Sequence, residues 1–133
     1  MNWNYITGFF DADGSVSLIT PNVGKRKTLQ LSFHNNELAI LHAIQAFIMQ
    51  ETGYKGSISR KKARKENHQD SYDLKYAYKA ALTVGENMNS IHPKKAHRFK
   101  VYRQIQDITP RNGWYTEELS EIRFKLEEEF WKH

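Results

Sequence analysis

The spacing of apolar residues changes several times along this chain, and each change predicts a helix or a strand. Alternation with a period of two is typical of half-buried strands, whereas apolar residues three or four positions apart indicate a helix with a buried stripe. Alternating segments predict strands over residues 15–20, 28–34, 56–64 and 71–84. Helical spacing predicts helices over residues 3–10, 37–52, 94–108 and 116–130, with a short one near 88–91.

The order of these elements predicts an α+β fold over residues 1–133 as one domain. Hairpins separated by helices favour one antiparallel four-stranded sheet with helices on a single face, in the order αββαββα. The other face of this saddle-shaped sheet is then open and polar. The apolar residues expected in the core are Leu29, Leu31 and Phe33 of the second strand, Leu38, Leu41, Ile44, Phe47 and Ile48 of the second helix, and Phe99, Tyr102, Ile105, Ile108, Leu119, Ile122, Leu126 and Phe130 of the last two long helices.

The segment of residues 6–14 places two acids where a helix is predicted to end. Asp11 and Asp13 follow an apolar run, and Gly14 fits the left-handed conformation that closes many helices. The carbonyl end of a helix favours cations, so two acids are unfavourable there. A divalent cation would remove the conflict, because hard oxygen ligands suit Mg²⁺ or Ca²⁺. Asp11 and Asp13 are therefore candidate metal ligands.

Two small residues, Thr7 and Gly8, interrupt the bulky residues of the same helix. Glycine lowers helix stability, so a glycine inside a helix is usually needed for packing. One such need is the close approach of a second helix backbone. The alternative is a short amphipathic helix that packs only on its own sheet. The acid pair that follows favours the close approach.

Composition and charge narrow the class of protein. The 133 residues are 39% hydrophobic, which suits a globular domain, and the net charge of +5 with a pI near 9.4 fits either plain solubility or an anionic partner such as nucleic acid. The absence of cysteine excludes disulfides and thiolate metal sites. No signal peptide or membrane-spanning run is recognised, so a soluble intracellular protein without a membrane partner is expected.

Two surface features have both a functional and a neutral interpretation. The predicted outer face of residues 28–34 is polar without strong charge, so it could read base edges or simply be solvated. Residues 60–65 carry five cations in six positions at the tip of a predicted hairpin. This basic run could be a solvated loop, but the rest of the chain favours contact with phosphates.

Residues 6–14 and four later segments resemble the LAGLIDADG homing endonucleases. The match to the nine-residue signature falls on Gly8, Asp11, Ala12, Asp13 and Gly14. Residues 14–18, 29–41, 92–99 and 116–122 resemble, in order, the family's first strand, its second strand and helix, its active-site lysine segment and its C-terminal helix opening. An EF-hand is excluded, because the twelfth position counted from Asp11 is Asn22 and not Glu.

The resemblance implies a hydrolytic nuclease that cuts DNA with a divalent metal. Asp13 matches the acid that binds Mg²⁺ over the scissile phosphate, and Mn²⁺ or Ca²⁺ can substitute in binding. The carbonyl of Ala12 is a further candidate metal ligand. Asp11 matches the other signature acid, which more often closes the helix than binds metal.

The resemblance also implies further catalytic residues. Glu37 falls where the family has a polar residue that orders active-site water, and Asn36 takes that role if the register differs by one. Lys94 matches the basic residue near the attacking water, with Lys95 as the alternative. Phosphodiester hydrolysis needs little more than a metal-activated water and a cation on the leaving oxygen.

The chain has a single signature, which in this family implies a homodimer on a long, roughly palindromic DNA site. The implied dimer interface consists of Ile6, Thr7, Gly8, Phe10 and Asp11. The implied DNA contacts, from the sheet and nearby basic residues, are Ser17, Ile19, Lys25, Arg26, Thr28, Gln30, Ser32, His34, Ser59, Lys61, Arg64 and Lys75.

Other functions remain as alternatives on the same scaffold. One is a nucleic-acid-binding protein that does not cut, such as a maturase for intron RNA or a DNA-binding regulator. Such a protein has no need of Asp13 and a basic partner, and both are present. A purely structural domain would leave Asp11 and Asp13 unexplained. The nuclease engaged in intron homing is therefore the preferred hypothesis.

Overall fold

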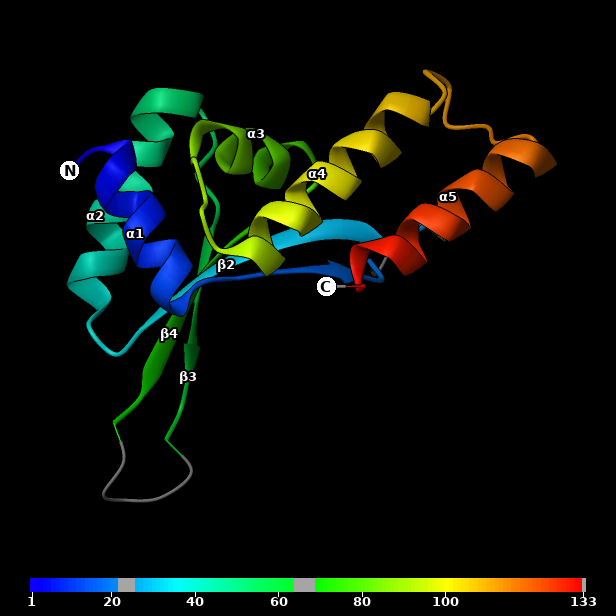
Figure 1. The fold of residues 1–133 in the computed structure, drawn as a ribbon. Coiled ribbons are helices and arrows are strands. Elements are labelled where there is room, and N and C mark those ends of the chain that lie inside the picture. The colour runs from blue at the N-terminus through cyan, green and yellow to red at the C-terminus, as the bar shows by residue number, and fades with distance from the viewer. Residues whose placement is uncertain (22–25, 64–68, 133) are drawn as a thin grey trace.

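The computed structural model describes residues 1–21, 26–63 and 69–132. It consists of a layer of helices on a four-stranded sheet. The four strands pair antiparallel in the order β1-β2-β4-β3, as Figure 1 shows. The strands are β1 (Ser15–Ile19), β2 (Thr28–Asn35), β3 (Ser57–Lys61) and β4 (Ser71–Ala77). The helices are α1 (Trp3–Asp13), α2 (Leu38–Thr52), α3 (Lys79–Asn87), α4 (Pro93–Ile108) and α5 (Glu117–Phe130).

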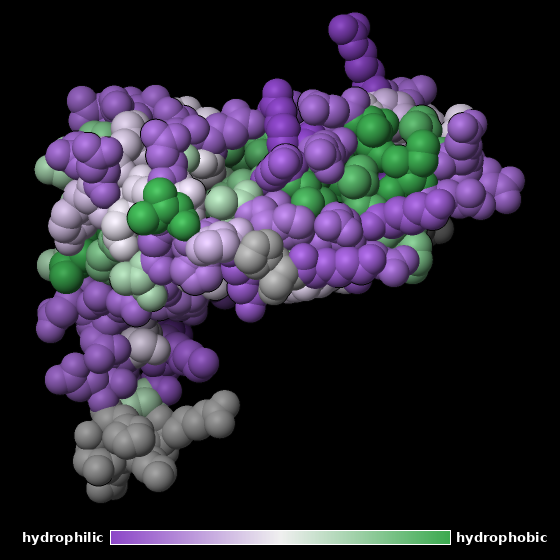
Figure 2. Space-filling view, in the orientation of Figure 1, coloured by the Kyte–Doolittle hydropathy of each residue, from purple (hydrophilic) through white to green (hydrophobic). Residues whose placement is uncertain are grey.

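The helices lie on one side of the sheet, and the β3–β4 hairpin extends away from them (Figure 1). α1 and α2 pack on β2, and α4 packs on β1 and beside α5. Hydrophilic side chains cover the described part of the hairpin, as Figure 2 shows. The predicted α+β fold with a four-stranded antiparallel sheet is confirmed. None of the described helices is long and apolar enough to cross a bilayer.

The core lies between the helices and the inward face of the sheet. Alternate strand residues point into it, including Leu29, Leu31 and Phe33, which are fully buried as predicted. The predicted stripe of α2 is also confirmed, since Leu41, Ile44 and Ile48 have no exposed surface. Four further core residues come from α1, β1 and β4: Ile6, Phe10, Val16 and Leu74. Gly53 ends α2 in the left-handed conformation, with φ of 82°.

The fourth predicted strand is too long. β4 ends at Ala77, and Tyr78 turns the backbone with a φ of 58°. Residues 79–87 then form α3. Apolar residues recur at helical spacing there, from Ala81 to Met88, and the run of alanines favours helix over strand. The alternation of tyrosines up to Tyr78 hid this second period.

The predicted short helix near residues 88–91 is also wrong. Met88 is the C-cap of α3, and Ile91 lies on the surface with 88% of its area exposed. Gly85, expected to break a strand, lies inside α3 against the ring of Phe99. A Cβ at this position would stand 2.3 Å from that ring, so Gly85 allows α3 and α4 to approach closely.

The buried stripe of α5 is shifted from the prediction by one residue. Arg123 is buried with 5% exposed, whereas Ile122 is 40% exposed. Phe130 is buried and Leu126 is partly buried, as predicted. The sequence pattern favoured the isoleucine because arginine is rarely buried without partners.

Gly14 closes α1 for a reason that differs from the prediction. Its φ is −80°, so the left-handed conformation expected there is wrong. The backbone passes so close to the ring of Phe10 that a Cβ would stand 2.2 Å from it. Gly14 is therefore required by this close approach.

Gly14→Ala is expected to lower the free energy of unfolding by about 1–3 kcal/mol, because the fully buried Phe10 cannot move aside without strain. Chemical denaturation of the isolated chain measures the change. Gly8→Ala is the matched control, since no atom lies within 4 Å of its Cβ position. Equal stability of Gly14→Ala and the native chain would show that the contact is relaxed at no cost.

Candidate active site and nucleic-acid interface

The two signature acids have different surroundings at the end of α1. The carboxylate of Asp11 accepts hydrogen bonds from the Ser90 hydroxyl and, at 3.0 Å, from the amide of Ile91. Both of its oxygens therefore hold the connection between α3 and α4. Asp13 is exposed. This geometry gives Asp11 a structural role and leaves Asp13 as the signature carboxylate that faces solvent.

Lys95 lies at the carbonyl end of α1. Its Nζ donates to the carbonyl oxygens of Phe10 at 2.7 Å and Asp11 at 3.0 Å. A cation is favoured at this end of a helix, where the last carbonyls lack partners. Lys94 is exposed on the first turn of α4. The structure thus brings Lys95, and not the preferred candidate Lys94, to the signature helix.

Burial lowers the pKa of Lys95 below its usual value, while the charges of Asp11 and, less strongly, Asp13 oppose this shift. Asp13→Asn removes one opposing charge, so the pKa of Lys95 is expected to fall further. NMR of the lysine side chains through an alkaline titration measures both values. A Lys95 midpoint that stays unchanged in Asp13→Asn would show that the two charges do not interact.

A polar hollow of about 320 Å³ brings several predicted residues together at this end of the sheet. It is lined by Asp13 from α1, by His34 and Asn35 at the end of β2, by Asn36 directly after it, and by Ser71 from β4. Asn36 therefore faces the same hollow as Asp13, whereas Glu37 is not among the described lining residues. Asn35 also accepts a hydrogen bond from the Glu37 amide at 2.7 Å, which fixes the start of α2.

The hollow suits a divalent metal only in part. Asp13 offers a hard carboxylate ligand, and the amide oxygens of Asn35 and Asn36 are of the same kind. Ala12 is exposed beside them. Among the described residues no group of three or more acids, histidines or cysteines could hold a metal by itself. One chain therefore supplies a single free signature carboxylate, that of Asp13. A divalent metal ion usually has more charged ligands than this.

The open face of the sheet gathers polar side chains in rows across the strands. Cross-strand pairing aligns Ser17 with Gln30, and it aligns Ser15, Ser32, Lys75 and Ser57 in a second row. A third row joins His34, Asp73 and Ser59. Lys61 lies opposite Ser71 nearer the hairpin end. These rows carry hydrogen-bond donors and acceptors at regular spacing across a twisted surface.

One pair on this face was not singled out from the sequence. The ring Nδ1 of His34 contacts the carboxylate of Asp73, and its Nε2 lies 3.3 Å from the Ser15 hydroxyl. The alternation of β4 places Asp73 on the outer face, but the partnership depends on the strand register. Ile19 is partly exposed at the far end of β1.

Four of the predicted DNA contacts lie away from the open face or cannot be placed, and a fifth, Ser32, is only 4% exposed. Thr28 is 2% exposed and its hydroxyl lies 3.4 Å from that of Tyr102 on α4, so its side chain is not on the open face. Lys25 and Arg64 lie outside the described residues. The guanidinium of Arg26 stacks on Tyr115 at 3.9 Å, which turns it toward the helices.

The candidate interface residues of α1 divide into two sets. Ile6 and Phe10 are fully buried in the core of the same chain, so they are not available to a partner. Gly8 is exposed, with no atom within 4 Å of where its Cβ would be. The Thr7 hydroxyl bonds back to the Trp3 carbonyl at 2.7 Å, which hides its polar group. The outer face of α1 is thus smooth around Gly8.

Three solved structures that share this fold are described as homing endonucleases or a meganuclease, each with DNA. The chain matches the homing endonuclease I-GzeII in complex with its DNA target (TM-score 0.63, 17% identity) and the meganuclease I-AabMI bound to uncleaved DNA (TM-score 0.64, 17% identity) over 96% of its own length. It spans 42% and 44% of those two chains. The archaeal intron-encoded endonuclease I-Vdi141I complexed with DNA matches with a TM-score of 0.56 and 23% identity, over 96% of this chain and 82% of that one.

The sequence itself carries the family pattern. No curated protein matches the chain significantly. Residues 6–106 match the pattern described as LAGLIDADG endonuclease, a span that includes the signature, the sheet and most of α4. This is well over half of the 133 residues. The chain therefore belongs to the LAGLIDADG endonuclease family.

Proposed function

We propose that this protein is a site-specific double-strand DNA endonuclease that works as a homodimer with a divalent metal. The observation that carries the proposal is the different use of the two signature acids. Asp11 is committed to Ser90 and Ile91, whereas Asp13 stands exposed beside a polar hollow with Lys95 nearby. An acid at the carbonyl end of a helix is unfavourable, and within the described part of the chain Asp13 has no hydrogen bond or ion pair that would compensate.

The dimer follows from what one chain lacks. A single Asp13 is a weak metal site, and two copies packed along α1 would place two such carboxylates together. The exposed Gly8 allows two helix backbones to approach closely, and the exposed Ala12 continues this smooth strip one turn later. Because Ile6 and Phe10 are buried in their own chain, the proposed interface uses only this outer face.

Within the hollow, Asp13 would hold the metal, with the Ala12 carbonyl as a further ligand. Bound Mg²⁺ would supply an activated water and charge stabilisation at the phosphate. The Asn36 amide faces the same space and can orient a water by hydrogen bonding. The Lys95 ammonium fixes the end of α1 and adds positive charge near Asp13. Glu37 is a less suitable candidate, because it is exposed outside the described lining.

DNA would lie on the open face of the sheet. The more accessible members of these rows, Ser17, Gln30, His34 and Ser59, offer groups that can bond base edges. Lys61 and Lys75 add positive charge for phosphates, so affinity should fall steeply with salt. The related structures are described as bound to DNA, which supports the same use of this sheet. In a dimer, the two sheets would each read one half of a roughly palindromic site.

Selection of cleaved sites from a randomised duplex library with Mg²⁺ tests this function. The expected result is a family of cleaved sequences with two related half-sites, and none without metal. Mn²⁺ should support the same cut positions. A chain that binds duplex DNA or intron RNA but cuts nothing in the library would contradict the nuclease and favour a non-cleaving binding protein on this fold.

A further inference from the structure

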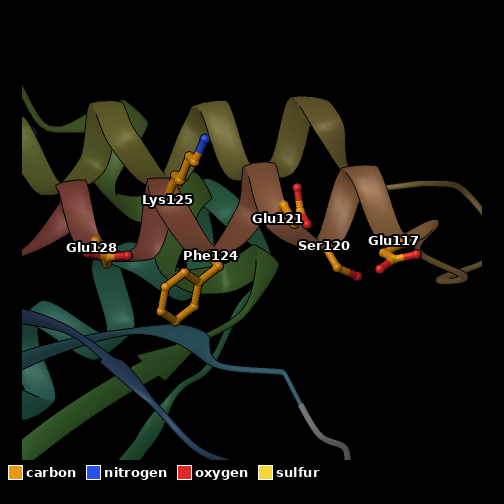
Figure 3. A pocket seen from close by; sticks show the side chains of 6 residues that line it. All are labelled: Glu117, Ser120, Glu121, Phe124, Lys125 and Glu128. Atoms are coloured by element: carbon orange, nitrogen blue, oxygen red, sulfur yellow. The ribbon is translucent and has the colours of Figure 1, made fainter.

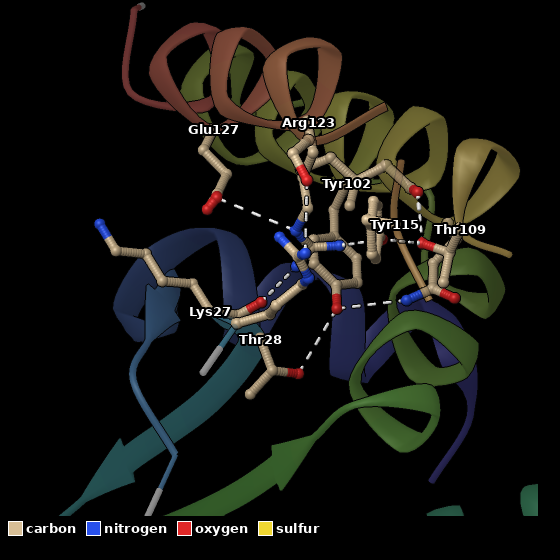
Figure 4. Close-up of polar contacts among 11 residues, drawn as sticks. Lys27, Thr28, Tyr102, Thr109, Tyr115, Arg123 and Glu127 are labelled. Carbon is tan, nitrogen blue, oxygen red and sulfur yellow. Dashed lines mark hydrogen bonds and ion pairs between the residues drawn. The ribbon is translucent and has the colours of Figure 1, made fainter. Parts of the chain in front are cut away.

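A second cavity, named here the arginine pocket, lies at the opposite end of β2 from the Asp13 hollow. Figure 4 shows polar contacts among residues that line it. β2 runs from Thr28 beside this pocket to Asn35 beside the hollow, about 23 Å away at the usual rise of a strand. The two cavities share no described lining residue. The arginine pocket has a volume of about 240 Å³ and is lined by Arg26, Lys27, Tyr102, Thr109, Tyr115 and Arg123, among others.

The described lining is positively charged. Arg26, Lys27 and Arg123 contribute three cations, and none of the described lining residues is an acid. The carboxylate of Glu127 lies just outside and forms an ion pair with Arg123, 3.9 Å from its Nε. The pocket therefore has more positive charge than its immediate surroundings balance.

Arg123 is the most buried of these cations, with 5% of its surface exposed. Its guanidinium donates to the Tyr115 hydroxyl at 2.9 Å and to the Lys27 carbonyl, and Glu127 is its ion-pair partner. Arg26 and Lys27 are therefore the lining cations without an acidic partner among the described residues. These two exposed cations give the pocket its uncompensated positive charge.

A second arginine approaches the same ring. The Arg26 guanidinium lies 3.9 Å from the centre of the Tyr115 ring, and that of Arg123 lies 5.6 Å from it. Tyr102, Thr109 and Tyr115 also line the pocket, and their hydroxyls are held by hydrogen bonds to one another or to Thr28, Gln106 and Arg123. The planar guanidinium groups match the oxygens of a phosphate group.

We propose that the arginine pocket binds a phosphate group. The volume admits a phosphate with a small attached group, such as a sugar, but not a folded partner. Two sources share this chemistry: a backbone phosphate of a nucleic acid and a small phosphate compound such as a nucleotide. Binding here does not depend on whether the chain cuts DNA.

A neighbouring cavity on α5 has the opposite character (Figure 3). It is lined by Glu117, Glu121 and Glu128, together with Ser120, Phe124 and Lys125. Its volume of about 480 Å³ is larger, but three acids against one lysine exclude it as an anion site. Positive charge is therefore a feature of the arginine pocket and not of the helical side as a whole.

The test is a titration of the native chain with inorganic phosphate, followed by amide NMR and referenced to chloride at equal ionic strength. Saturable shifts are expected at Lys27, Thr28 and Tyr115. Arg26→Gln should weaken phosphate binding about tenfold, as the loss of one charged hydrogen bond does. Arg103→Gln is the matched control, since it removes an exposed arginine from α4 that is paired with Glu86 and does not line the pocket, and it should leave the affinity unchanged.

A second titration, with duplex DNA of arbitrary sequence, separates the two sources. DNA that shifts the same amides and displaces inorganic phosphate identifies a backbone phosphate, whereas DNA that leaves phosphate bound identifies a small phosphate compound. Shifts no larger than those with chloride would overturn the proposal. So would an affinity in Arg26→Gln equal to that of the native chain, because Arg26 is exposed and its loss does not disturb the core.

Discussion

Asp13→Asn is expected to abolish DNA cleavage while leaving DNA binding intact. The amide keeps the shape of the side chain but removes the negative charge that would hold the metal. Loss of a metal ligand at the reacting phosphate is worth several kcal/mol, which corresponds to a rate lower by about 10³-fold or more. Single-turnover cleavage of a selected site measures the rate, and a gel-shift assay measures binding.

Asp11→Asn is the matched control for this result. The Asp11 carboxylate accepts two hydrogen bonds from the α3–α4 connection, and an asparagine can accept them only through its one oxygen. The expected loss is in stability, by about 1–3 kcal/mol, whereas Asp13→Asn should unfold like the native chain because Asp13 is exposed. Cleavage that survives Asp13→Asn would contradict the assignment of the metal ligand.

Gly8→Ala is expected to have opposite effects on the chain and on its self-association. Within one chain the position is exposed and open, so alanine should stabilise α1 by about 0.5–1 kcal/mol. Between two helices packed at Gly8, the added methyl groups should cost about 1–3 kcal/mol, which weakens the dimer about 10- to 100-fold. Denaturation of the dilute chain and sedimentation with DNA measure the two effects.

The control for Gly8→Ala is Gln104→Ala on the exposed side of α4. This substitution should change neither self-association nor cleavage. If Gly8→Ala stabilised the chain and left the dimer unchanged, α1 would not form the interface through Gly8.

The sequence predicts the sheet, the core of β2 and the stripe of α2 because each has a single clear period. The prediction is wrong where the period of a strand and the period of a helix overlap. Alternating tyrosines run up to Tyr78, directly before α3, so the pattern predicts a strand that extends seven residues beyond Ala77. The phase of α5 was misjudged because a buried arginine, Arg123, occupies the place of an apolar residue.

In the candidate site, the sequence does not distinguish between neighbouring residues, because their roles depend on tertiary contacts. Asp13 follows from local sequence, but the choice of Lys95 over Lys94 depends on how α4 lies against α1. Asn36 rather than Glu37 lines the hollow because the first turn of α2 begins only after Glu37. The role of Asp11 depends on Ser90, which is 79 residues away in the chain. Contacts of this kind have no local signal.

In the proposed dimer, two copies pack along α1 and bring two Asp13 side chains to one DNA site. The chain has no cysteine, so a single Ala12→Cys substitution tests this packing without interference. Disulfide formation requires two Cα atoms within about 7 Å. On a selected DNA site under oxidising conditions, Ala12→Cys should form a covalent dimer, whereas Gln104→Cys should not. A chain that stays monomeric on that DNA, with no cross-link at residue 12, would contradict this packing.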